Sequence, residues 1–361
     1  MEKQNAKIVA VIGMHRSGTS VIARGLQVLG VDLGNKLMPP YEGNNSKGFW
    51  EDLDINQLNI EMLHALKSDW HFLTPVQSPD VELLCNNGYL ARAVELLQEK
   101  TASEGIFGFK DPRVAKLLPF WKQVFRQGQW NVSYVVVIRH PLSVCHSLAK
   151  RDGLAFEQSY LLWLEHVIGS LAGTEEQNRV LVDYDHFMQN PATELTRMAE
   201  KFHFTVDTAE LQKFQDEFLD HRLQHTAYRL NDLLRDTKAL PLVQEVYSSL
   251  LNSLTDNAVL ENPQLKNKVS QWNSEFSRMR SALVFADTLS ITLAATTAER
   301  DALNSERNKL LRERAELKKD FLAKEQAIQR LKTELLAIYQ SRMWRWSQPL
   351  RRWFGMFRKP K

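Results

Sequence analysis

Residues 8–20 read Ile-Val-Ala-Val-Ile-Gly-Met-His-Arg-Ser-Gly-Thr-Ser, an apolar, β-branched run that ends in glycine and passes into a short polar loop. A helical pattern follows over about residues 19–29. This order predicts a strand, a phosphate-binding loop and the N-terminus of a helix. Backbone N–H groups at such a terminus carry partial positive charge and bind anions. The stretch therefore predicts an anion site at the end of the first strand.

The glycines of this loop have the spacing of a Walker A motif, but the lysine of that motif is missing. Gly13 and Gly18 are separated by four residues, as in the loops that bind nucleoside triphosphates. Thr19 stands where the lysine that binds the β- and γ-phosphates would be, and the cation of the loop is Arg16 instead. The loop suits an anionic group on a nucleotide. A degenerate loop of another P-loop protein is the alternative that this motif alone leaves open.

Further strand-like runs alternate with helical patterns. The predicted strands lie at about residues 7–12, 105–110, 132–139 and 180–184, and the helices after them near 141–150, 157–171 and from 191. Apolar strands separated by helices predict an α/β fold with a parallel sheet covered on both faces. Ligands of such sheets bind beyond the carboxyl ends of the strands. Polar segments that follow strands should therefore share one site; they are residues 13–20, Lys110–Arg113, Arg139 and Tyr184–Asp185.

The size and composition of the chain limit its class. Its 361 residues suffice for a large α/β domain with an appendage, and a net charge of +3 is too small to indicate nucleic acid. Two cysteines, Cys85 and Cys145, lack metal-ligand spacing and predict a reducing compartment. The N-terminus has no apolar signal-peptide core, and no apolar stretch approaches the roughly 20 residues of a membrane span. We therefore expect a cytoplasmic catalytic part.

Two segments resemble the cofactor-binding motifs of the PAPS-dependent sulfotransferases. The first is Arg16-Ser17-Gly18-Thr19-Ser20, which resembles the loop that binds the 5′-phosphosulfate of 3′-phosphoadenosine 5′-phosphosulfate (PAPS). The second is Arg139 with Ser147 eight residues later; the matching residues of the family hold the 3′-phosphate, a role that suits a guanidinium and a hydroxyl. Weaker matches are Lys110–Arg113 and Val182–Pro191. The resemblance covers about residues 7–225 and implies a P-loop-like sulfotransferase domain that uses PAPS without a metal.

The resemblance also implies roles for individual residues. It assigns cofactor binding to His15, Arg16, Ser17, Gly18, Thr19, Ser20, Arg139 and Ser147, with His15 shaping the loop. Arg16 and Lys110 would stabilise charge on the leaving phosphate. Members of the family use a histidine or a glutamate as general base, and we choose Glu51, which opens a helical pattern after a loop; its alternative role is a helix N-terminal acid. Reserve candidates for the base are Glu42, Asp52, Asp111 and His71, and His225 could approach the nucleotide.

The C-terminal part differs from the rest of the chain. Residues 299–339 contain no proline or glycine, and eight of eleven positions at alternating spacings of four and three are apolar. The exceptions are Arg307, Arg314 and Lys324. The pattern predicts a long helix that self-associates as a coiled coil over residues 291–340. An amphipathic helix folded back on the main domain, residues 1–290, is the alternative.

The last 21 residues, 341–361, form a basic and aromatic tail without an acidic residue. Arginine and tryptophan suit the headgroup level of an anionic bilayer, which places the protein at the inner face of the membrane. The tail resembles segments that end some bacterial glycosyltransferases, and this favours a glycan or lipid-linked glycan as acceptor. A disordered tail, or one that docks on the core, is the alternative.

Together these features predict a sulfotransferase that transfers the sulfuryl group of PAPS to an acceptor hydroxyl. Two other functions stay open. One is a non-catalytic, membrane-associated assembly protein with a degenerate nucleotide-binding domain. The other is a P-loop kinase, which the missing lysine disfavours.

Overall fold

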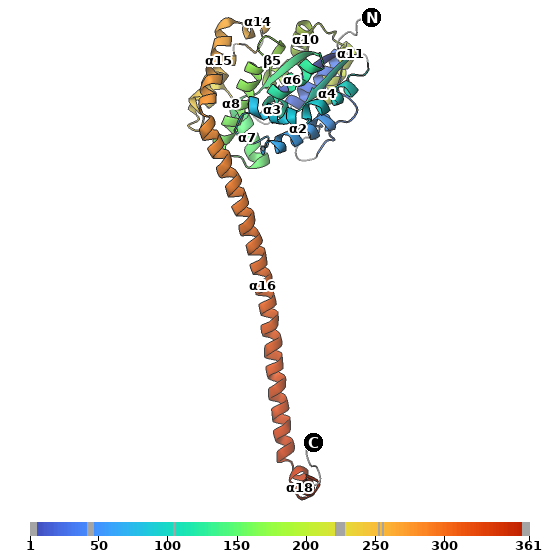
Figure 1. Cartoon of the computed structure of the whole chain (residues 1–361), viewed down its shortest axis with the longest axis vertical. Helices are drawn as coiled ribbons and strands as arrows, with labels where there is room; N and C mark the ends of the chain where they lie inside the picture. Colours follow the sequence, from blue (N-terminus) through green and yellow to red (C-terminus); the bar gives the residue numbers. More distant parts are fainter. Residues whose placement is uncertain are drawn as a thin grey trace. The chain divides into compact units, whose positions relative to one another are not determined.

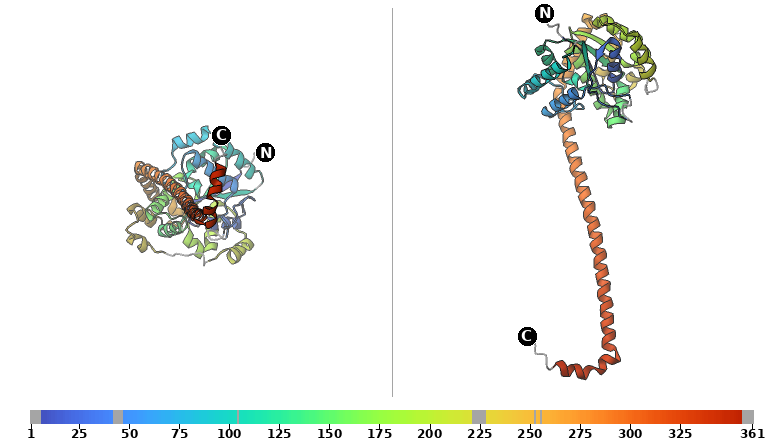
Figure 2. Two further views of the ribbon diagram at one scale, coloured as in Figure 1. Left: turned by 90° about the horizontal axis from the view of Figure 1, so that it is seen from below. Right: turned by 90° about the vertical axis from the view of Figure 1, so that its right-hand side faces the viewer.

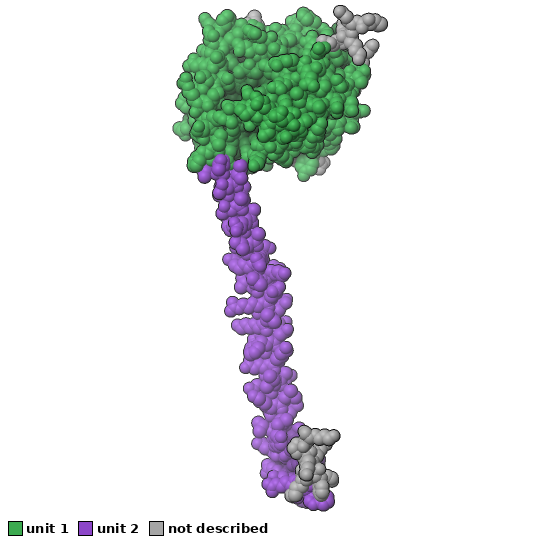
Figure 3. All heavy atoms as spheres, viewed as in Figure 1, with its two compact units in different colours: residues 1–287 green, residues 288–361 purple. Residues whose placement is uncertain are grey.

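The computed structural model describes residues 6–41, 47–103, 105–220, 228–251, 253–254 and 256–355. The chain divides into two compact units, residues 1–287 and 288–361, which have different colours in Figure 3. The α/β sheet and the candidate site lie in unit 1. Unit 2 consists of most of a long helix and the tail.

A five-stranded parallel sheet forms the centre of unit 1, with the strand order β2-β3-β1-β4-β5. The strands are β1 (Lys7–Gly13), β2 (Val31–Asp32), β3 (Ile106–Lys110), β4 (Asn131–Ile138) and β5 (Asn178–Asp183). The predicted parallel sheet is confirmed, and β2 is an addition at its edge. Because β1 is the middle strand, the loop that follows it lies between the ends of β3 and β4, with Val11 paired to Lys110 and Gly13 to Val137.

Two apolar clusters cover the two faces of this sheet. Alternate residues of β1 contribute to each: Ile8 and Ile12 pack in one cluster and Val9 and Val11 in the other. Burial on both faces explains why the strands read as continuous apolar runs without alternation. Figures 1 and 2 show helices on both sides of the sheet.

The helices of unit 1 surround the sheet. They are α1 (Thr19–Gly25), α2 (Leu53–Ala65), α3 (Ser78–Asn86), α4 (Tyr89–Lys100), α5 (Arg113–Lys116), α6 (Leu118–Gln127), α7 (Pro141–Asp152), α8 (Phe156–Gly173), α9 (Tyr184–Gln189), α10 (Pro191–Phe202), α11 (Thr208–Lys213), α12 (Leu230–Arg235), α13 (Pro241–Leu251), α14 (Asn257–Leu260), α15 (Pro263–Arg278) and the start of α16 (Arg280–Gln340). Of these, α1, α2, α5, α7 and α9 contribute residues to the cavity described below. The first predicted helix is split, because α1 passes into a 3-10 turn at Leu26–Leu29.

The predicted long C-terminal helix is confirmed as α16, which has 61 residues. At 1.5 Å per residue it is roughly 90 Å long. The apolar residues of its predicted seam are exposed: 56% for Leu310, 70% for Leu317, 53% for Ile328 and 53% for Leu335. Two short helices, α17 (Arg342–Trp346) and α18 (Gln348–Gly355), follow in the tail.

The expectation that no segment approaches a membrane span is wrong for α16. By length and composition alone, this helix is apolar enough to cross a membrane. The first turns of α16 have a different role in unit 1, where Leu283 packs in the core and Asp287 is buried.

Candidate active site

The loop after β1, residues 13–20, is here called the glycine loop. Arg16 and Gly18 adopt left-handed backbone angles, with φ of 68° and 82°. A Cβ atom on Gly18 would lie 1.9 Å from the Tyr184 ring, and one on Gly13 would lie 2.5 Å from the carbonyl oxygen of Val137. Glycine is therefore required at both positions for the loop to pack against the ends of β4 and β5.

The glycine loop and the start of α7 meet, as their resemblance to the two cofactor motifs predicts. Arg16 Nε donates a hydrogen bond of 2.7 Å to Ser147 Oγ. Arg139 Nη1 donates to the carbonyl oxygen of Arg16 at 3.2 Å, and its guanidinium lies 4.5 Å from the centre of the Tyr184 ring. The Arg16 side chain thus lies with the residues expected at the 3′-phosphate, and Lys110 is left as the cation beside Glu51.

Positive charge accumulates in this part of the site. Burial, together with the charges of Arg151 and Arg139, lowers the pKa of Arg16. The Nε atom of Arg139 is buried and has no hydrogen-bond partner among the residues described; an ion pair with Asp185 is longer, at 3.9 Å. Buried donors in proteins are normally satisfied. An anionic ligand would satisfy Arg139 and relieve the repulsion between the guanidinium groups.

Glu51 and Lys110 form a buried ion pair, with 2.5 Å between Glu51 Oε1 and Lys110 Nζ. Asn56 of α2 donates to the other carboxylate oxygen at 2.8 Å, and Arg113 Nη1 lies 3.9 Å from it. Burial raises the pKa of Glu51, and the Lys110 ammonium opposes this shift. A carboxylate held in place with a raised pKa suits a general base.

Glu51 lies one residue before the N-cap of α2 and outside its first turn. Helix α2 begins at Leu53, and its cap is Asp52, which accepts hydrogen bonds from the N–H groups of Asp54 and Ile55 at 3.0 and 3.1 Å. Asp52 also binds the Lys100 ammonium at 2.6 Å. These contacts engage Asp52 in holding α2 and α4.

The other reserve candidates for the base have different positions. Asp111 is fully buried and accepts hydrogen bonds from Asn56, Asn59 and Arg113. His71 lies 3.8 Å from Asp69 and is not among the described residues that line the cavity. Glu42 and His225 lie outside the described residues.

His15 forms part of the wall of the site. The centres of the His15 and Trp70 rings lie 4.4 Å apart. The Nε2 atom of His15 is buried without a hydrogen-bond partner among the described side chains and backbone groups. Burial, with smaller contributions from Arg113 and Arg151, holds the pKa of His15 well below its usual range. His15 is therefore a neutral imidazole at pH 7.

A cavity of about 470 Å³ connects these groups. Of the predicted site residues, it is lined by His15, Arg16, Gly18, Thr19, Ser20, Glu51, Lys110 and Arg139. Ser17 and Ser147 do not line it in the part of the chain that the structure describes; Ser17 is buried and Ser147 binds Arg16. Trp70 and Arg151, which also line the cavity, were not predicted.

Two solved structures are similar to this chain. The sulfotransferase domain of the Synechococcus PCC 7002 olefin synthase has a TM-score of 0.39 and 15% identity, with 69% of this chain and 97% of that domain covered. Retinol dehydratase in complex with androsterone and the inactive cofactor PAP has a TM-score of 0.31 and 13% identity, with 74% and 80% covered. No family model and no curated protein matches the chain. These neighbours are sulfotransferases of low sequence identity, so the activity of this chain has to be argued from its own residues.

Proposed function

We propose that this protein is a sulfotransferase that transfers the sulfuryl group of PAPS to an acceptor hydroxyl, on a glycan or a lipid-linked glycan. The observation that carries the proposal is one cavity lined both by the Glu51–Lys110 pair and by Arg16 and Arg139. Sulfuryl transfer needs a base for the acceptor and cations for the donor, in reach of one another.

The charge of the cavity fits such a donor. Among the described residues, six basic and three acidic side chains line it: Arg16, Lys47, Lys110, Arg113, Arg139 and Arg151 against Glu51, Asp152 and Asp220. A nucleotide with a 3′-phosphate and a 5′-phosphosulfate brings several negative charges. When bound, PAPS would supply the sulfuryl group, with the Arg16 and Arg139 side chains at the 3′-phosphate and Lys110 and the other residues of the glycine loop at the 5′ end.

The chain's own residues would then divide the chemistry. Glu51 Oε1 or Oε2 would take the proton of the acceptor hydroxyl. Lys110, which holds Glu51 at 2.5 Å, would orient this carboxylate and balance negative charge at the donor end. A sulfuryl group carries less charge than a phosphoryl group, so the proposal needs no metal to mask it.

Two measurements test this function. Calorimetry should show binding of 3′-phosphoadenosine 5′-phosphate (PAP) in the absence of magnesium and weaker binding of ATP. Labelled PAPS incubated with extracts that contain candidate acceptors should yield labelled product. Binding of PAP without any turnover would favour the assembly protein, and preference for ATP would favour the kinase.

We further propose that the exposed seam of α16 pairs with a second copy of the chain. An isolated helix with apolar residues along one side is stabilised when that side is buried. Changing Leu310 and Leu317 to aspartate should therefore convert a dimer to a monomer in sedimentation velocity. Leu322→Asp, at an exposed apolar position beside the seam, is the matched control. A wild-type monomer at micromolar concentration would contradict the pairing.

The tail is proposed to bind anionic bilayers at the inner face of the membrane. Trp346 and Trp353 are 88% and 61% exposed, and Arg342, Arg345 and Arg351 lie on the same short helices. Removing residues 341–361 should release the protein from anionic vesicles in co-sedimentation while PAP binding is retained. Each basic residue near the surface contributes roughly 1 kcal/mol, so binding should weaken with salt. If both forms stay in the supernatant at low salt, the tail does not bind membrane.

A further inference from the structure

A segment between α2 and α3, residues 69–75, is here called the strap. Its first part contributes Trp70 to the wall of the cavity. Its backbone is held by side chains that are distant in the sequence: Gln158 donates to the His71 carbonyl at 3.2 Å and Arg280 to the Pro75 carbonyl at 2.8 Å. The strap has no helix or strand of its own and is held by these side chains.

Asp287 of α16 makes three hydrogen bonds with the strap. Its carboxylate accepts hydrogen bonds from Leu73 N and Thr74 N, both at 2.8 Å, and from Thr74 Oγ1 at 2.6 Å. Asp287 is buried, with 7% of its surface exposed. Hydrogen bonds to a charged group are stronger than neutral ones. The three bonds to one buried carboxylate therefore fix the backbone of the strap at Leu73 and Thr74.

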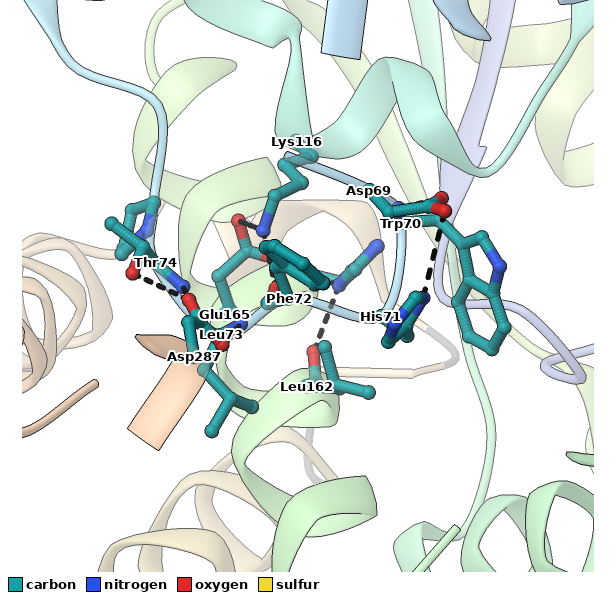
Figure 4. Close-up of polar contacts among 12 residues, drawn as sticks. Asp69, Trp70, His71, Phe72, Leu73, Thr74, Lys116, Leu162, Glu165 and Asp287 are labelled. Carbon is teal, nitrogen blue, oxygen red and sulfur yellow. Dashed lines mark hydrogen bonds and ion pairs between the residues drawn. The ribbon is translucent and has the colours of Figure 1, made fainter. Parts of the chain in front are cut away.

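A second buried charge holds the strap at Phe72. Lys116, whose side chain is fully buried, donates to the Phe72 carbonyl at 2.6 Å and lies 3.5 Å from Glu165. Burial opposes the shift, but the nearby Lys116 ammonium helps hold the pKa of Glu165 below its usual value. Asp287 and Lys116 thus hold adjacent parts of the strap, at Leu73–Thr74 and at Phe72 (Figure 4).

Trp70 connects the strap to the residues around Glu51. The centre of its ring lies 4.4 Å from the centre of the His15 ring. The Arg151 guanidinium carbon lies 5.2 Å from the centre of the Trp70 ring. Burial lowers the pKa of Arg113, but three nearby carboxylates raise it overall. Asp111 and Glu51 have the larger effects, and Asp69, next to Trp70, has a smaller one. The start of the strap is therefore within electrostatic reach of the guanidinium that lies beside Glu51.

We infer that Asp287 is a positioning residue for acceptor binding, which acts by fixing the strap so that Trp70 and His15 form the wall that faces the acceptor near Glu51. The inference rests on the proposed function. Ser147 and Arg139, which the proposed function places at the 3′-phosphate, hydrogen-bond to Arg16 of the glycine loop. Loss of Asp287 should therefore affect the acceptor more than the 3′-phosphate end of the donor.

The test compares Asp287→Asn, Trp70→Ala and the double variant by steady-state kinetics with labelled PAPS. Asparagine cannot accept from both strap N–H groups and the Thr74 hydroxyl as the carboxylate does. Asp287→Asn should raise the acceptor KM about tenfold, the scale of a misplaced binding group, with kcat and the PAP Kd changed less than about twofold. Because both residues act through one wall, adding Asp287→Asn to Trp70→Ala should raise KM little further.

Asp80→Asn is the matched control. Asp80 accepts a backbone N–H from Gln77 at 2.8 Å, just beyond the strap, so its loss removes a comparable contact without touching residues 69–75. It should leave the acceptor KM unchanged. Full additivity of Asp287→Asn and Trp70→Ala, or an equal loss of PAP affinity, would overturn the inference.

Hydrogen exchange supplies a readout that does not depend on activity. In Asp287→Asn, the amides of residues 70–74 should exchange faster while those of residues 14–20 keep the wild-type rate. Unchanged exchange in the strap would also overturn the inference. If the wild type fails to turn over PAPS with any acceptor, the proposed function fails, whereas the exchange data still decide whether Asp287 fixes Trp70.

Discussion

Glu51→Gln is expected to lower PAPS turnover by about 10²- to 10⁴-fold while leaving PAP affinity nearly unchanged, because a general base acts in the chemical step. Glutamine keeps the shape of the side chain, and its carbonyl oxygen can still accept from Lys110 or from Asn56. It cannot take a proton from the acceptor at neutral pH. Turnover of labelled PAPS and calorimetry with PAP measure the two quantities separately.

The pH profile gives an independent check of this role. Burial raises the pKa of Glu51, and the base must be ionised to work, so activity should fall as the pH falls through that raised value. Glu61→Gln is the control, because Glu61 is a glutamate on the outer face of α2 that pairs with Arg92. Retained turnover in Glu51→Gln would show that the base lies elsewhere, and His15, whose Nε2 has no hydrogen-bond partner among the described residues, would be tested next.

Glu51→Gln removes the charged partner of Lys110, so the folding of this variant also has to be tested. The Lys110 side chain is 2% exposed, and an unpaired charge at such a site destabilises a protein. PAP binding by Glu51→Gln would show that the site still forms. Loss of both turnover and PAP binding would point to the fold rather than to the base.

Arg139→Ala is expected to weaken PAP binding by about 1.5–3 kcal/mol, the scale of a hydrogen bond to a charged group. The Arg139 guanidinium lies on the Tyr184 ring, and its buried Nε has no hydrogen-bond partner in the described chain. This N–H group is therefore available to donate to the 3′-phosphate of PAP. Calorimetry without magnesium measures the change. The effect should be small for adenosine 5′-phosphate, which lacks the 3′-phosphate.

The comparison of the two nucleotides separates recognition from support of the loop. Arg139 also donates to the carbonyl oxygen of Arg16, so its loss could loosen the glycine loop for any nucleotide. Equal weakening of PAP and adenosine 5′-phosphate would mean that Arg139 acts only through this bond. Arg139→Lys keeps the charge but loses the planar fork, and it should recover only part of the PAP affinity.

The sheet could be predicted from the sequence because its strands are buried on both faces. Runs such as residues 135–138 are apolar throughout and fully buried. The edge strand Val31–Asp32 could not be predicted, since two residues form no pattern. The start of α16 at Arg280 was also missed, because residues 280–287 belong to unit 1, where Leu283 and Asp287 are buried, and do not follow the later spacing of apolar residues.

The two halves of the site differ in how far they could be predicted. Arg16 and Arg139 follow neighbouring parallel strands, so the topology brings them together. Glu51 and Lys110 were both candidates, but their ion pair depends on the path of a loop that no periodicity describes. Trp70 was missed because its place depends on side chains such as Asp287, and a contact between residues 73 and 287 leaves no local pattern.

The packing of Gly18 against Tyr184 has a consequence for how this site can change in evolution. Any side chain at residue 18 would displace the Tyr184 ring, and losing that ring would remove the surface on which Arg139 lies. Substitutions at these three positions are thus coupled, and lineages should inherit the trio intact or lose it as a set.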